Sequence, residues 1–112
     1  MLLFVSIDNI SIIKSSETSL YLRKHSINKA LLVDVYHEFS HPKEIMTSLY
    51  EAMKPGGEVY LVEYRGEDVT IPIKPIHKMT EAQAILEMHA IGFRFKKNIG
   101  NLPWQHFLVF EK

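Results

Sequence analysis

Hydrophobic and polar positions alternate along this chain in blocks that predict both strands and helices. A nearly continuous apolar run at residues 30–36 predicts a strand covered on both faces, and residues 59–62 form a second such run. Residues 93–97 and 107–110 predict two further strands. The linker between these last two is too short for a helical crossover, so we expect them to be antiparallel neighbours.

Two helices are predicted between these strands. Pro42 stands at the first helical position of one helix, and apolar residues at helical spacing follow it up to the Lys-Pro-Gly-Gly stop at residues 54–57. Thr80 and Gln83 have the spacing of a capping box at the start of the other helix, which Gly92 ends. The residues expected on the inner face of this second helix are Ala82, Ile85, Leu86 and His89.

Weaker signals precede and separate these elements. Residues 2–7 and 9–14 have the composition of two short strands, and the proline-rich stretch 66–78 predicts a loop. Residues 15–18 fit a loop or a helix cap, and residues 20–26 fit a short helix or a loop.

The element order from residue 30 onward is strand, helix, strand, helix, strand, strand. This order indicates one α/β domain over residues 1–112, with parallel strands joined by right-handed crossover helices. The C-terminal strand pair departs from that plan by being antiparallel.

Composition narrows the functional classes. Of the 112 residues 46% are hydrophobic, and Lys plus Arg balance Asp plus Glu at 13 each, so nothing indicates a nucleic-acid partner. The absence of cysteine excludes disulfides and thiolate chemistry. No apolar stretch is long enough to cross a membrane and no signal-peptide pattern is present, so we expect a cytoplasmic protein without a membrane partner.

The strand at residues 30–36 runs into ionisable residues, among which the stretch His37 to His41 matches the zinc-protease pattern His-Glu-x-x-His. That pattern needs both histidines on one turn of a helix. Pro42 disfavours helical geometry at His41, and the preceding residues have the pattern of a strand. We therefore expect no metal site here, and a zinc hydrolase is the most distant functional hypothesis.

Five segments, in order, resemble the C-terminal half of class I S-adenosylmethionine-dependent methyltransferases. They are residues 33–42 (VDVYHEFSHP), 54–57 (KPGG), 61–65 (LVEYR), 77–83 (HKMTEAQ) and 102–112 (LPWQHFLVFEK). The resemblance runs from about residue 30 to residue 112, and it implies part of the Rossmann-like sheet of that family. Residues 9–14 would then match the third strand of the family.

The resemblance also implies roles for residues at the ends of two strands. Cofactor-binding candidates are Asp34 and Val35, and the candidate catalytic bases or orienting groups are Tyr36, His37 and Glu63. Substrate-binding candidates are Tyr64, Arg65, His77 and Trp104. Plainer alternatives stay open, since Asp34 would also suit a helix cap, Tyr36 the core and His37 a bond to a loop carbonyl.

The sequence departs from the family at its cofactor loop. In the family this loop is glycine-rich, so that backbone can approach the methionine part of the cofactor. No Gly-x-Gly occurs here, and all five glycines have other roles in turns and helix ends. We therefore expect S-adenosylmethionine to be the cofactor by family, but to bind this chain alone weakly or not at all.

The missing first strand of the family has a second consequence. Without it, the strand at residues 30–36 exposes an apolar edge that is a template for pairing. Either residues 9–14 cover this edge or a second chain does. The expected partners are therefore a second copy of the chain or a separately encoded N-terminal half, besides a small-molecule substrate.

Two functional hypotheses follow. The first is a truncated or split methyltransferase, in which a substrate nucleophile displaces the methyl group and the protein acts mainly by positioning. The second is a non-catalytic module for dimerisation or interaction.

Overall fold

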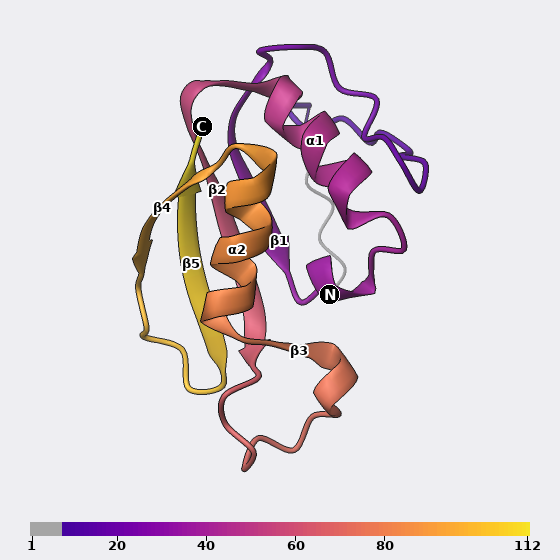
Figure 1. Cartoon of the computed structure of the whole chain (residues 1–112). Coiled ribbons are helices and arrows are strands. Elements are labelled where there is room, and N and C mark those ends of the chain that lie inside the picture. Colours follow the sequence, from indigo (N-terminus) through magenta and orange to yellow (C-terminus); the bar gives the residue numbers. More distant parts are fainter. Residues whose placement is uncertain (1–7) are drawn as a thin grey trace, which may run out of the picture.

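The computed structural model describes residues 8–112, which form a mixed α/β sheet with helices on one face (Figure 1). The predicted fold class, with parallel strands, crossover helices and a C-terminal antiparallel pair, is confirmed. The elements are β1 (Ile27–Val33), η1 (Tyr36–Glu38), α1 (Pro42–Ala52), β2 (Met53–Arg65), η2 (Pro75–His77), β3 (Lys78–Met79), α2 (Glu81–Ile91), β4 (Arg94–Asn98) and β5 (Gln105–Glu111).

The strand order in the sheet is β1-β2-β5-β4. β1 and β2 are parallel and are joined by α1, as the crossover pattern predicts. β5 lies between β2 and β4 and is antiparallel to both. The two-residue strand β3 runs parallel to the end of β2, beyond the point where β1 stops.

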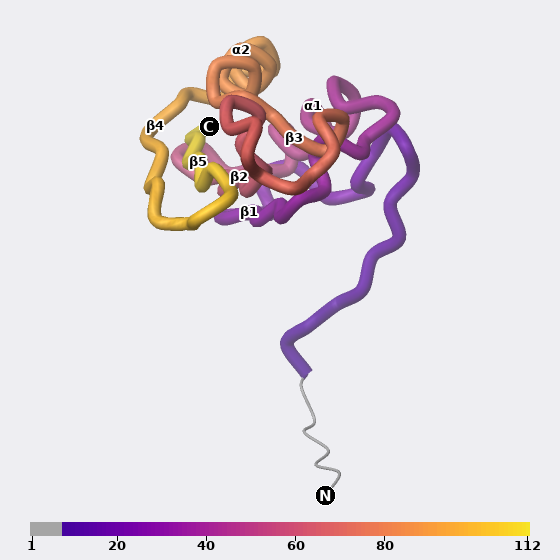
Figure 2. The backbone as a smooth tube through the Cα atoms, turned by 90° about the horizontal axis from the view of Figure 1, so that it is seen from below, coloured from indigo at the N-terminus to yellow at the C-terminus, as the bar shows by residue number. Residues whose placement is uncertain are grey.

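The core lies between the helices and one face of the sheet. Figure 2 shows α1 and α2 on the same side of the strands. The predicted stripe of α1 is confirmed, because Ile45, Leu49 and Ala52 are buried. The strand residues of this core are Val59 and Leu61 of β2 with Leu108 and Phe110 of β5.

The predicted inner face of α2 is wrong for three of its four residues, since only Ile85 packs against the core. Ala84 and Met88 are the buried residues of this helix, whereas Leu86 is 65% exposed and Ala82 and His89 lie in water. Apolar residues occur all around α2, so their spacing alone does not define which side meets the sheet. The small side chain of Ala84 is fully buried and belongs to the core.

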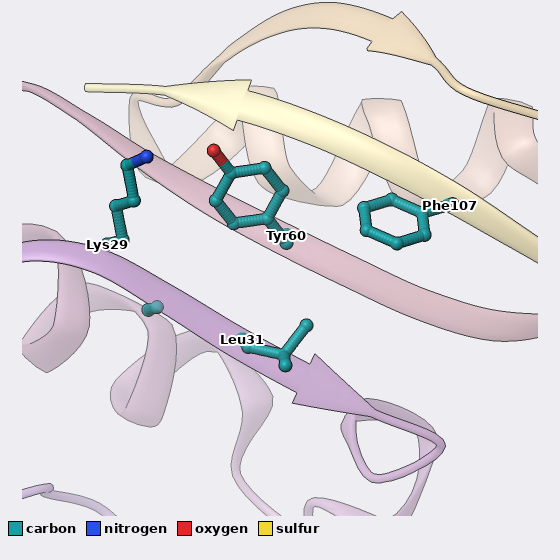
Figure 3. Close-up of a pocket in the computed structure, with 5 residues that line it drawn as sticks. Lys29, Leu31, Tyr60 and Phe107 are labelled. Atoms are coloured by element: carbon teal, nitrogen blue, oxygen red, sulfur yellow. The ribbon is translucent and has the colours of Figure 1, made fainter.

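The opposite face of the sheet carries no helix in the described part of the chain. Leu31 and Val33 on this face are 64% and 51% exposed, so the prediction that both faces of this strand are covered is wrong. Figure 3 shows Lys29, Leu31, Tyr60 and Phe107 on this face. They line an open hollow of about 390 Å³. We call this surface the bare face.

β1 is also an edge strand, because within residues 8–112 it pairs with β2 alone. The predicted strand at residues 9–14, and its match to the third strand of the family, is wrong. These residues form no strand, they run away from the sheet (Figure 2), and Ile10 and Ile12 are 67% and 96% exposed. Their apolar side chains favour a strand, but none of the described strands pairs with them. The strand predicted at residues 2–7 lies outside the described residues.

The segment before β1 is a loop. Residues 15–18 form a turn in which the Ser16 hydroxyl accepts from the Ser19 amide at 3.1 Å. Residues 20–26 contain no helix, and Tyr21 and His25 have positive φ. The amide of Leu20 donates to the Ser48 hydroxyl at 3.2 Å, which attaches this loop to α1.

The Lys-Pro-Gly-Gly segment is not a helix cap but the first part of β2, which starts directly after α1. β2 is longer than the predicted strand because its first part pairs with β1 at Met53 and with Lys112, whose amide donates to Gly57 O at 3.0 Å. A Cβ on Gly57 would lie 2.8 Å from Met53 Cε and 2.9 Å from Lys54 O, so this close approach requires glycine. None of the described helices is long and apolar enough to cross a membrane.

Candidate functional site

Polar residues gather where β1 and β2 end, as they do at ligand sites of open α/β sheets. The chain turns sharply after β1 because Asp34 adopts φ +52°, a left-handed conformation that Asp tolerates better than most residues. Its amide donates to Val62 O at 2.8 Å, and its Oδ2 accepts from Gln105 Nε2 at 3.2 Å. Its Oδ1 is buried and has no hydrogen-bond partner within the described residues.

His37 and Glu63 form the central contact of the site. His37 Nδ1 lies 2.6 Å from Glu63 Oε2, and the His37 amide donates to Glu63 Oε1 at 3.1 Å. Glu63 is fully buried near the end of β2, and the His37 side chain is only 8% exposed. Both carboxylate oxygens are therefore used to hold η1 against the end of the sheet.

Burial raises the pKa of Glu63, and the hydrogen bonds from His37 oppose that rise without cancelling it. The negative charge of Asp34 adds to the rise. The charge state of Glu63 therefore depends on its neighbours. Carboxyl groups with perturbed pKa values are common at functional sites.

Tyr36 is buried in the core, and its hydroxyl donates to Glu87 Oε1 on α2 at 2.7 Å. Burial raises the pKa of Tyr36, and the bond to Glu87 raises it further. A phenol held in this way is a poor general base. The geometry favours the alternative in which Tyr36 is a packing residue.

Three of the other candidates, His77, Arg65 and Trp104, lie in two separate regions. His77 in η2 lies beside His37, with ring centroids 5.3 Å apart, so the structure brings His37, Glu63 and His77 together. Arg65 instead binds the loop before β5, donating through its guanidinium to Leu102 O at 2.8 Å and through its amide to Trp104 O at 3.0 Å. Trp104 is 46% exposed.

Two further candidates lie at the margins of this cluster. Val35 precedes η1 and is 36% exposed. Tyr64 of β2 is partly buried and lies in register with Lys78 of β3 and Gln105 of β5.

Sequence reasoning missed Glu87 and Gln105 as partners of the candidate residues. In the sequence, Gln105 is only part of a segment before the last predicted strand. Glu87 has no feature that distinguishes it from other glutamates on a predicted helix. The Gln83 amide donates to Thr80 Oγ1 as a capping box requires, but the Gln83 side chain donates to Glu87 Oε2 at 2.7 Å. Such pairings join residues far apart in the chain, so spacing does not reveal them.

A small depression of about 280 Å³ lies beside these residues. It is just below the volume range of pockets that enclose a drug-sized ligand, about 300–1,000 Å³. The described residues therefore form a shallow depression here rather than an enclosed pocket. The lining residues are Tyr36, His37, Phe39, Pro42, Lys78, Met79, Gln83 and Glu87.

The zinc-protease pattern does not form its site. His41 is the residue before α1, with φ −131°, so the two histidines of the pattern do not share a helical turn. The His41 ring lies 3.0 Å from the Ser40 hydroxyl and 3.9 Å from Glu17.

The residues present fit only part of an S-adenosylmethionine site. The unpartnered Oδ1 of Asp34 is a buried acceptor that an amino or hydroxyl group could satisfy. The close backbone approach that a glycine-rich loop provides has no counterpart, because the chain has no Gly-x-Gly. No reaction step can therefore be derived through this cofactor from the chain alone.

Comparison with solved structures identifies the fold. A SAM-dependent methyltransferase from Aquifex aeolicus aligns with 92% of this chain at a TM-score of 0.82 and 17% identity. The methyltransferase in a complex with the Haloferax volcanii Trm112 methyltransferase activator aligns with 96% at a TM-score of 0.72 and 11% identity. The [4+2]-cyclase SpnF aligns with 73% at a TM-score of 0.62 and 19% identity. No protein-family model and no curated protein matches the sequence.

Over the part that it spans, the chain has the fold of the class I S-adenosylmethionine-dependent methyltransferases. It covers 55%, 63% and 31% of these three structures, so it spans roughly half the length of the two methyltransferases.

The raised pKa of Glu63 predicts how stability depends on pH. Because the pKa is higher in the folded chain than the ordinary value of 4.5, protonation of Glu63 favours the fold. This contribution is fully present below the pKa of the unfolded chain and is lost as the pH rises through the folded-state pKa. Urea denaturation of wild type and Glu63→Gln should give a difference in the free energy of unfolding, wild type minus variant, that falls with rising pH. A metal chelator in the buffer keeps any bound ion from affecting the comparison. A difference that grows instead would mean that His37 stabilises the carboxylate more than burial destabilises it.

Proposed function

We propose that this chain supplies the substrate-side half of an S-adenosylmethionine-dependent methyltransferase site. The observation that supports this most is the match to a methyltransferase structure over 92% of the chain. The polar cluster at the carboxyl ends of β1 and β2 is the second support. The fold is not sufficient by itself, since SpnF shares it and is a cyclase. Methyl transfer is therefore proposed on the basis of the site residues as well as the fold.

His37 is the proposed base or orienting group for the methyl acceptor. Its Nδ1 is held by Glu63, which leaves Nε2 as the ring nitrogen available to a substrate. A buried carboxylate beside an imidazole stabilises the positive charge that the ring acquires on accepting a proton. Asp34 and Val35 are the proposed contacts to the cofactor, and His77 is the proposed contact to a small-molecule substrate.

A second polypeptide segment is proposed to complete the site. It would bring the glycine-rich loop and pair with the free edge of β1, from a separately encoded N-terminal half or from a further part of a longer protein. The activator bound to the Haloferax volcanii relative supports the idea that this fold works with partner chains.

The first test is calorimetric titration of the chain with S-adenosylmethionine. We expect binding no tighter than ~1 mM, because the loop that approaches the cofactor is absent. At high cofactor concentration, NMR shift changes should be confined to residues 34–37 and their neighbours. Micromolar affinity for the chain alone would contradict an incomplete site, and shift changes elsewhere would contradict the placement of the cofactor.

A second candidate function is a dimerisation module without catalysis. The bare face and the free edge of β1 favour it, because an apolar edge strand pairs readily with a second copy. In this case the polar cluster would serve only to hold η1.

Sedimentation velocity over a concentration series tests this candidate. Burying a leucine contributes about 1.5–3 kcal/mol, so Leu31→Lys should weaken self-association by at least about tenfold. Leu86→Lys is the matched control, because Leu86 is equally exposed but lies on α2 at the other side of the sheet. A wild-type chain that stays monomeric at high concentration, or equal effects of both substitutions, would contradict the candidate.

A further inference from the structure

Three potential metal ligands meet beside the buried His37–Glu63 pair. They are His37, Glu38 and His77, and one ligand atom from each lies within 4.8 Å of the other two. His37 Nε2 is 3.8 Å from Glu38 Oε1, and the two imidazole rings are in edge contact at 5.3 Å. These residues come from η1 and η2, which are about forty residues apart in the chain. We propose that they form a binding site for a divalent transition-metal ion of the zinc type.

The orientation of His37 supports this site. When Glu63 is ionised its carboxylate only accepts hydrogen bonds, so the contact then puts the ring proton on Nδ1 and leaves the lone pair on Nε2. A histidine that donates its second ring nitrogen to a carboxylate is the usual arrangement behind a metal ligand, since it fixes the ring and makes it a stronger donor. Glu63 is fully buried and is therefore a rigid support.

The charges around the cluster also favour a cation. Glu38 and Glu63 have ion-pair contacts with His37, and no Lys or Arg pairs with either of them in the described part of the chain. Asp34 is close enough to act on Glu63 electrostatically. A divalent ion would offset the negative charge of Glu38 and Glu63.

The geometry needs only small side-chain movements. Ligands about 2.0–2.2 Å from a tetrahedral zinc ion lie roughly 3.3–3.6 Å from each other. The present separations exceed this by on the order of 1 Å. His77 is exposed and the Glu38 side chain is 62% exposed, so both can rotate toward the fixed ring of His37.

The donor set indicates the kind of ion. Two imidazoles and one carboxylate suit zinc, cobalt, nickel or iron better than magnesium or calcium, which prefer oxygen ligands. Three protein ligands leave one position open for water or for an oxygen or nitrogen atom of a small molecule. This site differs from the zinc-protease pattern, because His77 takes the place of His41.

The test is calorimetric titration of the untagged full chain with Zn²⁺, and it does not depend on methyl transfer. We expect one equivalent to bind with micromolar or tighter affinity. His77→Ala and Glu38→Gln, both at exposed positions, should each weaken binding at least tenfold. Glu63→Gln should weaken it about 10–100-fold, as loss of a supporting carboxylate does. His41→Ala is the matched control and should bind as wild type does.

Several results would overturn the site. They are no stoichiometric binding by wild type, unchanged affinity in His77→Ala, or a loss in His41→Ala as large as that in His77→Ala. Cobalt gives a second readout, because the visible spectrum of a bound Co²⁺ ion reports its coordination. A nitrogen- and oxygen-ligated spectrum in wild type that is lost in His77→Ala supports the site, and the same spectrum in both proteins overturns it.

Discussion

The feature on which the rest of this structure depends is a sheet that, among residues 8–112, carries helices on one side only. Both α1 and α2 pack on the face that carries Leu61 and Leu108, so a single layer of apolar contacts holds the domain together. The other face keeps Leu31 and Val33 in water, and β1 keeps one edge unpaired in the described chain. An α/β sheet of parallel strands is normally covered on both faces. Because one face and one edge of the sheet lack this cover within the described residues, we propose that another polypeptide segment completes the sheet and its site.

The polar site is a consequence of the same arrangement. A carboxyl group buried at the end of a central strand needs hydrogen-bond partners, and Glu63 finds them in the ring and the amide of His37. This pair fixes the turn between β1 and α1 and leaves Nε2 as the ring nitrogen of His37 that Glu63 does not hold. The two proposals for the site use the same fixed imidazole. In the first, His37 is a base or orienting group for the methyl acceptor. In the second, it is a ligand of a metal ion.

Much of the fold from residue 30 onward could be predicted, because periodicity, prolines and glycines mark its elements. The candidate cluster of His37 and Glu63 followed from the resemblance, since both residues end strands that meet at one edge of the sheet. Other features depend on contacts that spacing does not encode. The bonds from Tyr36 to Glu87 and from Gln105 to Asp34 join distant segments, and the proximity of His77 to His37 depends on the path of a long loop. The strand predicted at residues 9–14 failed because strand propensity needs a partner strand.

The most direct test of the open sheet is backbone hydrogen exchange, measured by NMR on the dilute, monomeric chain. The account predicts that amides of β1 pointing away from β2 exchange quickly, while amides of β2 and β5 in the centre of the sheet are protected. Strong protection of the outward amides of β1 in the monomer would contradict it, because the chain would then cover its own edge.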